Sequence, residues 1–88
     1  MSSTFPLGHM VITTNAGETL NPEDVSAALR RHASADWCEL DDEDRQSNER
    51  ALKVGGRLFS AYTDRNSVNF WIITEADRSV TTVLLPDD

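Results

Sequence analysis

The chain is poor in the residues that form disulfides and metal sites. Among its 88 residues, cysteine occurs once, as Cys38, and histidine occurs twice, as His9 and His32. A lone cysteine cannot form a disulfide within the chain, and these three side chains are fewer than the four ligands of a structural zinc site. We therefore expect a domain that holds no metal and no cofactor.

Basic residues and long apolar runs are also scarce. The sequence has 8 Lys and Arg against 15 Asp and Glu, which gives a net charge of -7. This balance disfavours direct binding of DNA, RNA or anionic lipid through a basic surface. No segment approaches the roughly 20 apolar residues of a membrane span, and the first residues lack the basic and apolar regions of a signal peptide. We expect a cytoplasmic protein with no membrane segment.

The length and the 39% apolar content suffice for one core, so residues 1–88 are expected to form a single small domain. Residues 22–33 have the pattern of an amphipathic helix, with Asn21 as its N-cap and Pro22 at its first position. A second helix is expected to begin after Asp41 and to end at about Val54. Its low apolar content indicates a helix on the surface.

The other segments have the pattern of β-strands. The sequence predicts a first strand at residues 9–14 with a turn at 15–17, and then strands at 57–62, 68–74 and 80–85. The short connections between the last three strands predict an antiparallel meander over residues 57–85. We expect an α+β fold in which this meander packs against the first helix. The strand at 68–74 lies at the centre of the sheet and the first strand at an edge.

A resemblance to a known protein family runs through residues 5–8, 31–37, 58–62, 70–79 and 81–86, of which residues 72–79 are the most specific. The chain resembles a family of short proteins that plasmids and other mobile elements of proteobacteria carry, and the resemblance covers nearly the whole chain. Members are usually labelled plasmid-related or of unknown function, and some are labelled restriction-modification subunits. The pair Gly55-Gly56 lacks the Gly-x-Gly-x-x-Gly pattern of a methyltransferase cofactor site. The resemblance implies residence on mobile DNA and identifies no catalytic residue.

Three groups of residues are candidates for catalysis. Glu75 and Asp77 share a loop and could bind Mg²⁺ or act as acid and base, but a polar hairpin loop, with Asp77 bound to backbone N–H groups and Arg78 paired with an acid, explains them more simply. His32 lies on the apolar face of the first helix, where a half-buried histidine that completes the core is expected. Cys38 lies among acids that disfavour a reactive thiolate. We expect no enzymatic activity.

The strongest functional signal is a segment in which acids greatly outnumber bases. Residues 36–49 contain seven acids and a single base, Arg45. Acids in the first turn of a helix can serve helix stability alone, and a solvated face is the simplest alternative interpretation. The candidate protein-binding residues are these acids together with Trp37 as an apolar anchor: Asp36, Trp37, Glu39, Asp41, Asp42, Glu43, Asp44 and Glu49.

The acidic segment and the resemblance together suggest a function based on binding. The hypothesis is that the protein occupies the basic nucleic-acid-binding surface of a host defence protein, such as a CRISPR effector or a restriction enzyme. The alternative is a structural or regulatory module for plasmid maintenance that forms a homodimer through Trp71 and Ile73. An enzyme that uses Glu75 and Asp77 is a third and more distant interpretation.

Overall fold

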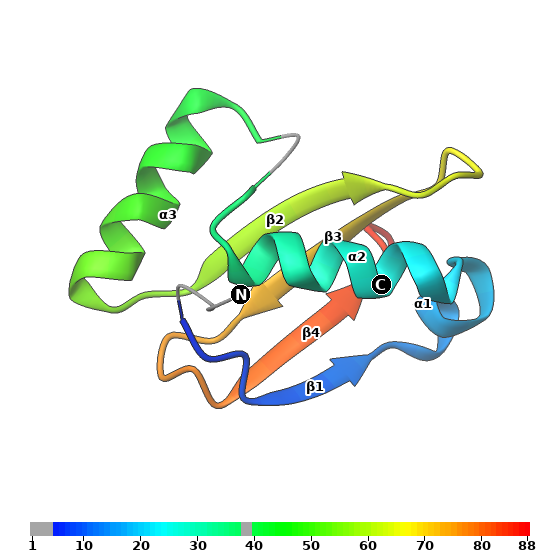
Figure 1. Ribbon diagram of the computed structural model, residues 1–88, viewed down its shortest axis with the longest axis horizontal. Coiled ribbons are helices and arrows are strands. Elements are labelled where there is room, and N and C mark those ends of the chain that lie inside the picture. Colours follow the sequence, from blue (N-terminus) through cyan, green and yellow to red (C-terminus); the bar gives the residue numbers. More distant parts are fainter. Residues whose placement is uncertain (1–4, 38–39) are drawn as a thin grey trace.

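The structure is a computed structural model that describes residues 5–37 and 40–88. The strands form one four-stranded sheet. Figure 1 shows one long helix lying across this sheet and another helix beside it. The elements follow in the order β1 (His9–Ile12), α1 (Thr14–Thr19), α2 (Pro22–Ala33), α3 (Asp42–Val54), β2 (Leu58–Thr63), β3 (Asn69–Thr74) and β4 (Val80–Leu84). The expected α+β class and both expected helices are therefore confirmed.

The sheet is mixed, with the strand order β1-β4-β3-β2. Strands β2, β3 and β4 form the expected antiparallel meander, in which Ala61 lies opposite Trp71 and Trp71 opposite Leu84. Strand β1 occupies an edge, as expected, and runs parallel to β4 with Val11 opposite Thr82. Helix α2 follows β1 and α1 in the chain and lies across one face of the sheet (Figure 1).

The segment after β1 differs from the sequence-based expectation. A turn was predicted at residues 15–17, but the chain forms the six-residue helix α1 from Thr14 to Thr19. The side-chain oxygen of Thr13 accepts a hydrogen bond from the N–H of Ala16 and so caps this helix. Ala16 is fully buried. A threonine cap and one buried alanine are weak signals in a sequence, so the sequence at residues 15–17 indicates a turn rather than a helix.

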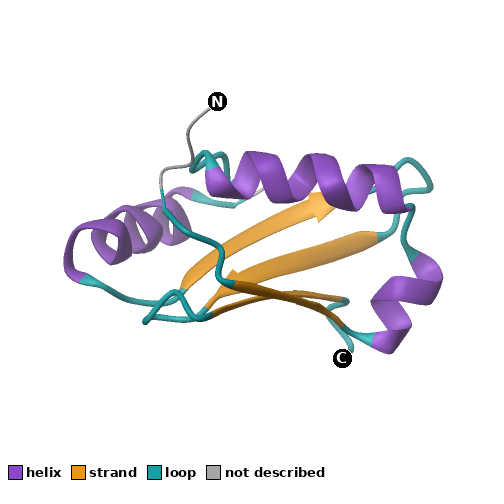
Figure 2. Cartoon of the chain, turned by 60° about the horizontal axis from the view of Figure 1, so that its bottom comes forward, coloured by secondary structure: helices purple, strands orange, loops and turns teal. Residues whose placement is uncertain are grey.

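Helix α2 covers one face of the sheet, which we call the inner face, and Figure 2 shows it lying over the strands. Asn21 caps α2 by accepting hydrogen bonds from the N–H groups of Glu23 and Asp24. Apart from the exposed end residues Thr63 and Asn69, strands β2, β3 and β4 alternate between buried and half-buried residues, so one row faces α2 and the other row faces away from it. The inner row consists of Leu58, Ser60, Tyr62, Phe70, Ile72, Thr74, Thr81 and Val83.

The opposite face, which we call the outer face, is only half-buried. Its apolar members are Phe59, Ala61, Trp71, Ile73, Val80 and Leu84. The rings of Phe59 and Trp71 meet edge to face at 5.3 Å, so these side chains shield one another from water. Figure 2 shows no helix over this face among residues 5–37 and 40–88.

The buried apolar residues form two clusters. The first lies between α2 and the sheet and includes Val25, Phe70 and Ile72. The second lies toward α3 and consists of Phe5, Trp37, Leu40, Ala51 and Leu58, with Leu52 and Phe59 packed against it. His32 lies beside the second cluster, because its ring contacts Phe5 at 5.2 Å and Trp37 at 5.5 Å.

A chain of hydrogen bonds runs from His32 through the core. Nδ1 of His32 lies 2.5 Å from the hydroxyl of Ser60, and Nε2 lies 2.9 Å from the hydroxyl of Thr74. The hydroxyl of Thr74 lies 2.8 Å from that of Thr81, which donates to the carbonyl of Leu7. His32, Ser60, Thr74 and Thr81 are all fully buried. The chain thus joins α2, three strands and the segment before β1.

This chain fixes the tautomer of His32. Thr81 uses its only hydroxyl proton on the carbonyl of Leu7, so it must accept from Thr74. Thr74 has then used its own proton and must accept from Nε2–H of His32. Nδ1 is therefore unprotonated and accepts from Ser60. The neutral imidazole satisfies every partner, and burial lowers the pKa of His32 from 6.5 to about 4, with a smaller contribution from the charge of Arg78.

The protein should lose stability as the pH falls from 6.5 towards 4. In that range the unfolded chain takes up a proton on His32 before the folded chain does, so protonation favours unfolding. Between about pH 7.5 and about pH 5 we expect the free energy of unfolding to fall by about 2 kcal/mol, as measured by urea denaturation.

Two variants isolate the contribution of His32. His32→Gln should be less stable overall but should lack this loss between the two pH values. His9→Gln changes an exposed histidine and should keep the loss. Equal stability of the unmodified protein at both pH values would contradict the prediction.

Candidate protein-binding site

The first turn of α3 concentrates carboxylates at one exposed end of the helix. Asp41, Asp42, Glu43 and Asp44 are consecutive and all exposed. Asp41 caps the helix, since its side chain accepts a hydrogen bond from the N–H of Asp44. Within residues 5–37 and 40–88, none of the four forms an ion pair. These four residues are called the acidic turn below.

Helix α3 is held against the free edge of β2 by a buried amide. The side-chain N–H₂ of Asn48 donates to the carbonyl of Phe59, and its side-chain oxygen accepts from the N–H of Phe59 at 3.0 Å. Asn48 is 2% exposed. One side chain thus satisfies both the N–H and the C=O of Phe59, which this residue of an edge strand would otherwise present to water. Asn48 was not singled out in the sequence, where a polar residue within a polar helix gives no signal.

The C-terminal end of α3 is held by Arg78. Its guanidinium donates to the carbonyls of Ala51 at 3.0 Å and Gly56 at 2.5 Å, and it lies 5.7 Å from the centre of the Phe5 ring. The expectation that Arg78 pairs with an acid is corrected, because its donors are used on backbone carbonyls. Gly55 ends the helix at a φ of 83°, a conformation that favours glycine. Asn48 and Arg78 thus help to fix the orientation of the acidic turn, together with the packing of Ala51 and Leu52 against the second cluster.

Not all of the predicted binding residues form one surface. Asp36 is exposed but forms an ion pair with Arg31 at 2.8 Å, so the protein itself neutralises it. Trp37 is 4% exposed and stacks on Phe5 within the second core cluster, so the prediction of an exposed anchor at Trp37 is corrected. Phe5, in the segment before β1, contributes to this burial by stacking on the indole ring. Glu39 lies outside the described residues.

The negative charge does not extend along the whole of α3. The helix carries four acids, Asp42, Glu43, Asp44 and Glu49, and three bases, Arg45, Arg50 and Lys53. Glu49 is exposed and lies seven residues after Asp42, so the two share a face of the helix. Lys53 follows Glu49 by four residues and is its neighbour on that face. A dense anionic surface is therefore restricted to the acidic turn.

The catalytic alternatives receive no geometric support from the described residues. Asp77 accepts hydrogen bonds from the N–H and hydroxyl of Ser79, as the hairpin-loop interpretation expected, and these lower the pKa of Asp77. Glu75 pairs with Arg57 at 3.2 Å. His32 belongs to the core, as expected, but it is fully buried where the sequence predicts a half-buried side chain. Among residues 5–37 and 40–88, no group of three or more His, Cys, Asp or Glu could hold a metal ion.

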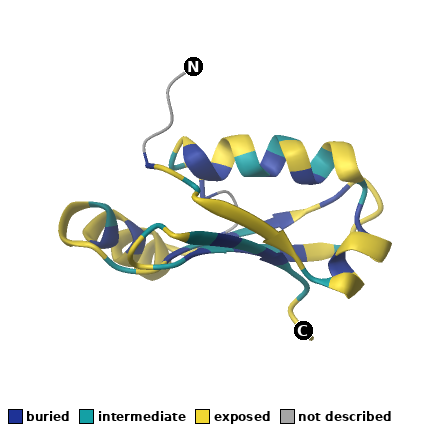
Figure 3. Cartoon of the chain, turned by 90° about the horizontal axis from the view of Figure 1, so that it is seen from below, coloured by how far each residue is buried: buried dark blue, intermediate teal, exposed yellow. Residues whose placement is uncertain are grey.

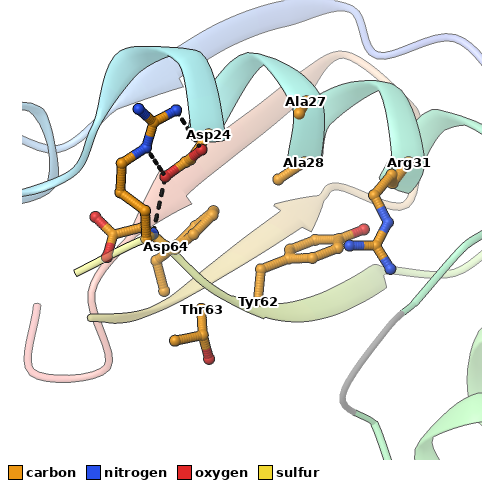
Figure 4. A pocket seen from close by; sticks show the side chains of 9 residues that line it. Asp24, Ala27, Ala28, Arg31, Tyr62, Thr63 and Asp64 are labelled. Atoms are coloured by element: carbon orange, nitrogen blue, oxygen red, sulfur yellow. Dashed lines mark hydrogen bonds and ion pairs between the residues drawn. The ribbon is translucent and has the colours of Figure 1, made fainter. Parts of the chain in front are cut away.

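A shallow pocket of about 260 Å³ lies between α2 and the end of β2 (Figure 4). Its charged groups are already paired. Arg65 donates to Asp24 at 3.0 Å, which lowers the pKa of Asp24, and Arg31 is held by Asp36 and lies over the ring of Tyr62. The lining residues are Asp24, Ala27, Ala28, Arg31, Tyr62, Thr63, Asp64, Arg65 and Phe70. A pocket lined by paired charges offers little to a ligand.

Comparisons with known proteins add no assignment. No protein-family model, curated protein or solved structure matches the chain. In the part of the chain that the structure describes, no helix is long and apolar enough to cross a membrane.

The replacement Asn48→Ala should lower the free energy of unfolding by about 2 to 3 kcal/mol, because it leaves both backbone groups of Phe59 without their partner. The matched control is Gln46→Ala, an exposed position on the same helix, which should change the free energy by less than about 0.5 kcal/mol. Urea denaturation of both variants tests this. Equal stabilities would show that Asn48 does not hold α3.

Proposed function

We propose that the chain is a non-enzymatic, acidic binding protein of a mobile genetic element that acts in the cytoplasm. It inhibits a host defence protein that targets nucleic acid, a CRISPR effector or a restriction enzyme, by occupying its basic DNA- or RNA-binding surface. The observation that supports this proposal is the acidic turn, in which four exposed carboxylates have no cationic partner among the described residues.

The spacing of these charges is comparable to that of a nucleic acid. One helical turn rises about 5.4 Å, and duplex DNA carries about three phosphate charges over that length. The acidic turn offers four carboxylates over a similar length. It is one turn long, so it matches a small basic patch on the target rather than a long groove.

The position of α3 favours contact with a large partner. The helix lies beside β2 and outside the α2–sheet sandwich (Figure 1). Asn48 and Arg78 hold its inward side, which leaves the acidic turn accessible from outside. Arg50 and Lys53 at the other end of the helix would resist a uniformly basic surface, so the polarity of α3 restricts how the target can approach.

The homodimeric accessory module is the second candidate. It depends on Trp71 and Ile73, which lie on the outer face of the sheet but are half-buried there rather than fully exposed. The ring of Trp71 already packs edge to face against Phe59, and this candidate is therefore less well supported than the acidic turn.

The double variant Asp42→Asn/Glu43→Gln tests the proposed function. It removes two charges of the acidic turn and keeps Asp41, which caps the helix. We expect binding to a purified CRISPR effector or restriction enzyme, in competition with duplex DNA, to weaken by at least about tenfold. Protection of a plasmid or phage in cells with active CRISPR or restriction immunity should fall in parallel.

The matched control is Glu18→Gln/Asp87→Asn, which removes the same number of charges from exposed positions outside α3. It should keep both binding and protection. Equal losses in the two variants would mean that only net charge matters. Binding by the unmodified protein that is insensitive to salt, or that occurs together with DNA, would contradict the proposal.

A further inference from the structure

Strand β1 is an exposed edge strand with unusually apolar side chains. All four of its residues are exposed, and Figure 3, which views the molecule from below, shows its exposed edge. Met10 is 56% exposed, Val11 40% and Ile12 45%. The other exposed large hydrophobic side chain among the described residues is Val54, at the end of α3. The apolar exposure of the domain is thus concentrated on one short strand.

The two edge strands of the sheet, β2 and β1, differ in how their outward backbone groups are covered. The β2 edge is covered at Phe59, whose N–H and C=O both bind the side-chain amide of Asn48. Edge strands without such a cover usually carry a charge or a proline that prevents pairing with another chain. Residues 1–17 include no Asp, Glu, Lys or Arg, although charged residues make up 26% of the sequence. Strand β1 therefore has neither a cover among the described residues nor a charged side chain.

The hydrogen bonds to β4 determine which backbone groups of β1 point outward. The N–H of His9 donates to Ser79 at 2.8 Å, and the N–H of Thr13 donates to Val83 at 3.0 Å. In a parallel ladder the alternate residues of a strand point toward the same neighbour. His9, Val11 and Thr13 thus face β4, and the N–H and C=O groups of Met10 and Ile12 face away from the sheet.

We propose that β1 pairs with β1 of a second copy of this chain, antiparallel, about a two-fold axis at Val11. In this register Met10 lies opposite Ile12 of the second copy, and each such pair exchanges both of its outward backbone hydrogen bonds. The side chains of Met10 and Ile12 then contact their counterparts on one side of the sheet and the two Val11 side chains meet on the other. A single arrangement covers all three exposed apolar side chains.

A second copy suits this edge better than a strand of unrelated sequence. Two copies with a net charge of -7 each repel one another, and the two β1 strands bring no carboxylate of their own into contact, since residues 1–17 contain no Asp or Glu. Asp88 binds Thr13 and Asn15 just beyond the strand. The apolar residues flank Val11 on both sides, so the strand is complementary to itself, as a two-fold interface requires. This inference does not depend on the target of the acidic turn.

The test is the mass of the protein in solution, measured by sedimentation from about 1 µM to about 300 µM. We expect the mass to double within this range. Met10→Pro removes an outward N–H that the monomer does not use, and it should raise the dissociation constant of the dimer by at least about tenfold. Met10→Lys, which places a charge on the edge, should have the same effect even if the proline variant folds poorly.

Two controls locate the interface. Val54→Lys makes the same kind of replacement at the exposed apolar residue of α3 and should leave the dimer intact. In the unmodified dimer, the amide protons of Met10 and Ile12 should exchange with solvent more slowly than in the dilute monomer. A monomer at every concentration would overturn the proposal. So would a dimer in which these amides still exchange rapidly, because the copies would then meet elsewhere, for example through the outer face.

Discussion

The hydrogen-bond chain through His32 is the interaction on which the fold most depends. It connects α2 to β2 and β3 through the imidazole, and β3 to β4 and the segment before β1 through two threonines. Each member has one proton arrangement that satisfies its neighbours, so removal of a single hydroxyl would leave a buried polar atom without a partner. The apolar clusters on either side supply most of the burial, and this polar chain determines how they are aligned.

Much of the architecture could be predicted from local sequence signals. Asn21 and Pro22 mark the start of α2, and Asp41 and Gly55 mark both ends of α3. The apolar block Phe70-Trp71-Ile72-Ile73, which places large apolar side chains on both faces, indicates a central strand. These signals act over a few residues, so the sequence reveals them directly. Helix α1 and the parallel direction of β1 were not predicted, because they depend on burial of Ala16 and on pairing with β4, which lies about 70 residues away.

The candidate site also combines features that local sequence indicates with features that only the fold determines. Charge density could be read from residues 36–49, and the exposure of Asp41, Asp42, Glu43 and Asp44 agrees with it. The pairing of Asp36 with Arg31 and the burial of Trp37 could not be read, because both depend on how the chain turns back after α2. Asn48 and Arg78, which orient α3, resemble ordinary surface residues until the fold brings them to the backbone atoms that they bind.

The attachment of α3 has a consequence for the dynamics of the domain. Apart from Ala51 and Leu52, the helix joins the core through polar contacts, whereas α2 and the sheet share a continuous apolar cluster. Water competes for polar contacts far more effectively than for apolar burial. Helix α3 is therefore the element that we expect to open first while the rest of the domain stays folded, and its amide protons should then exchange faster than those of β3.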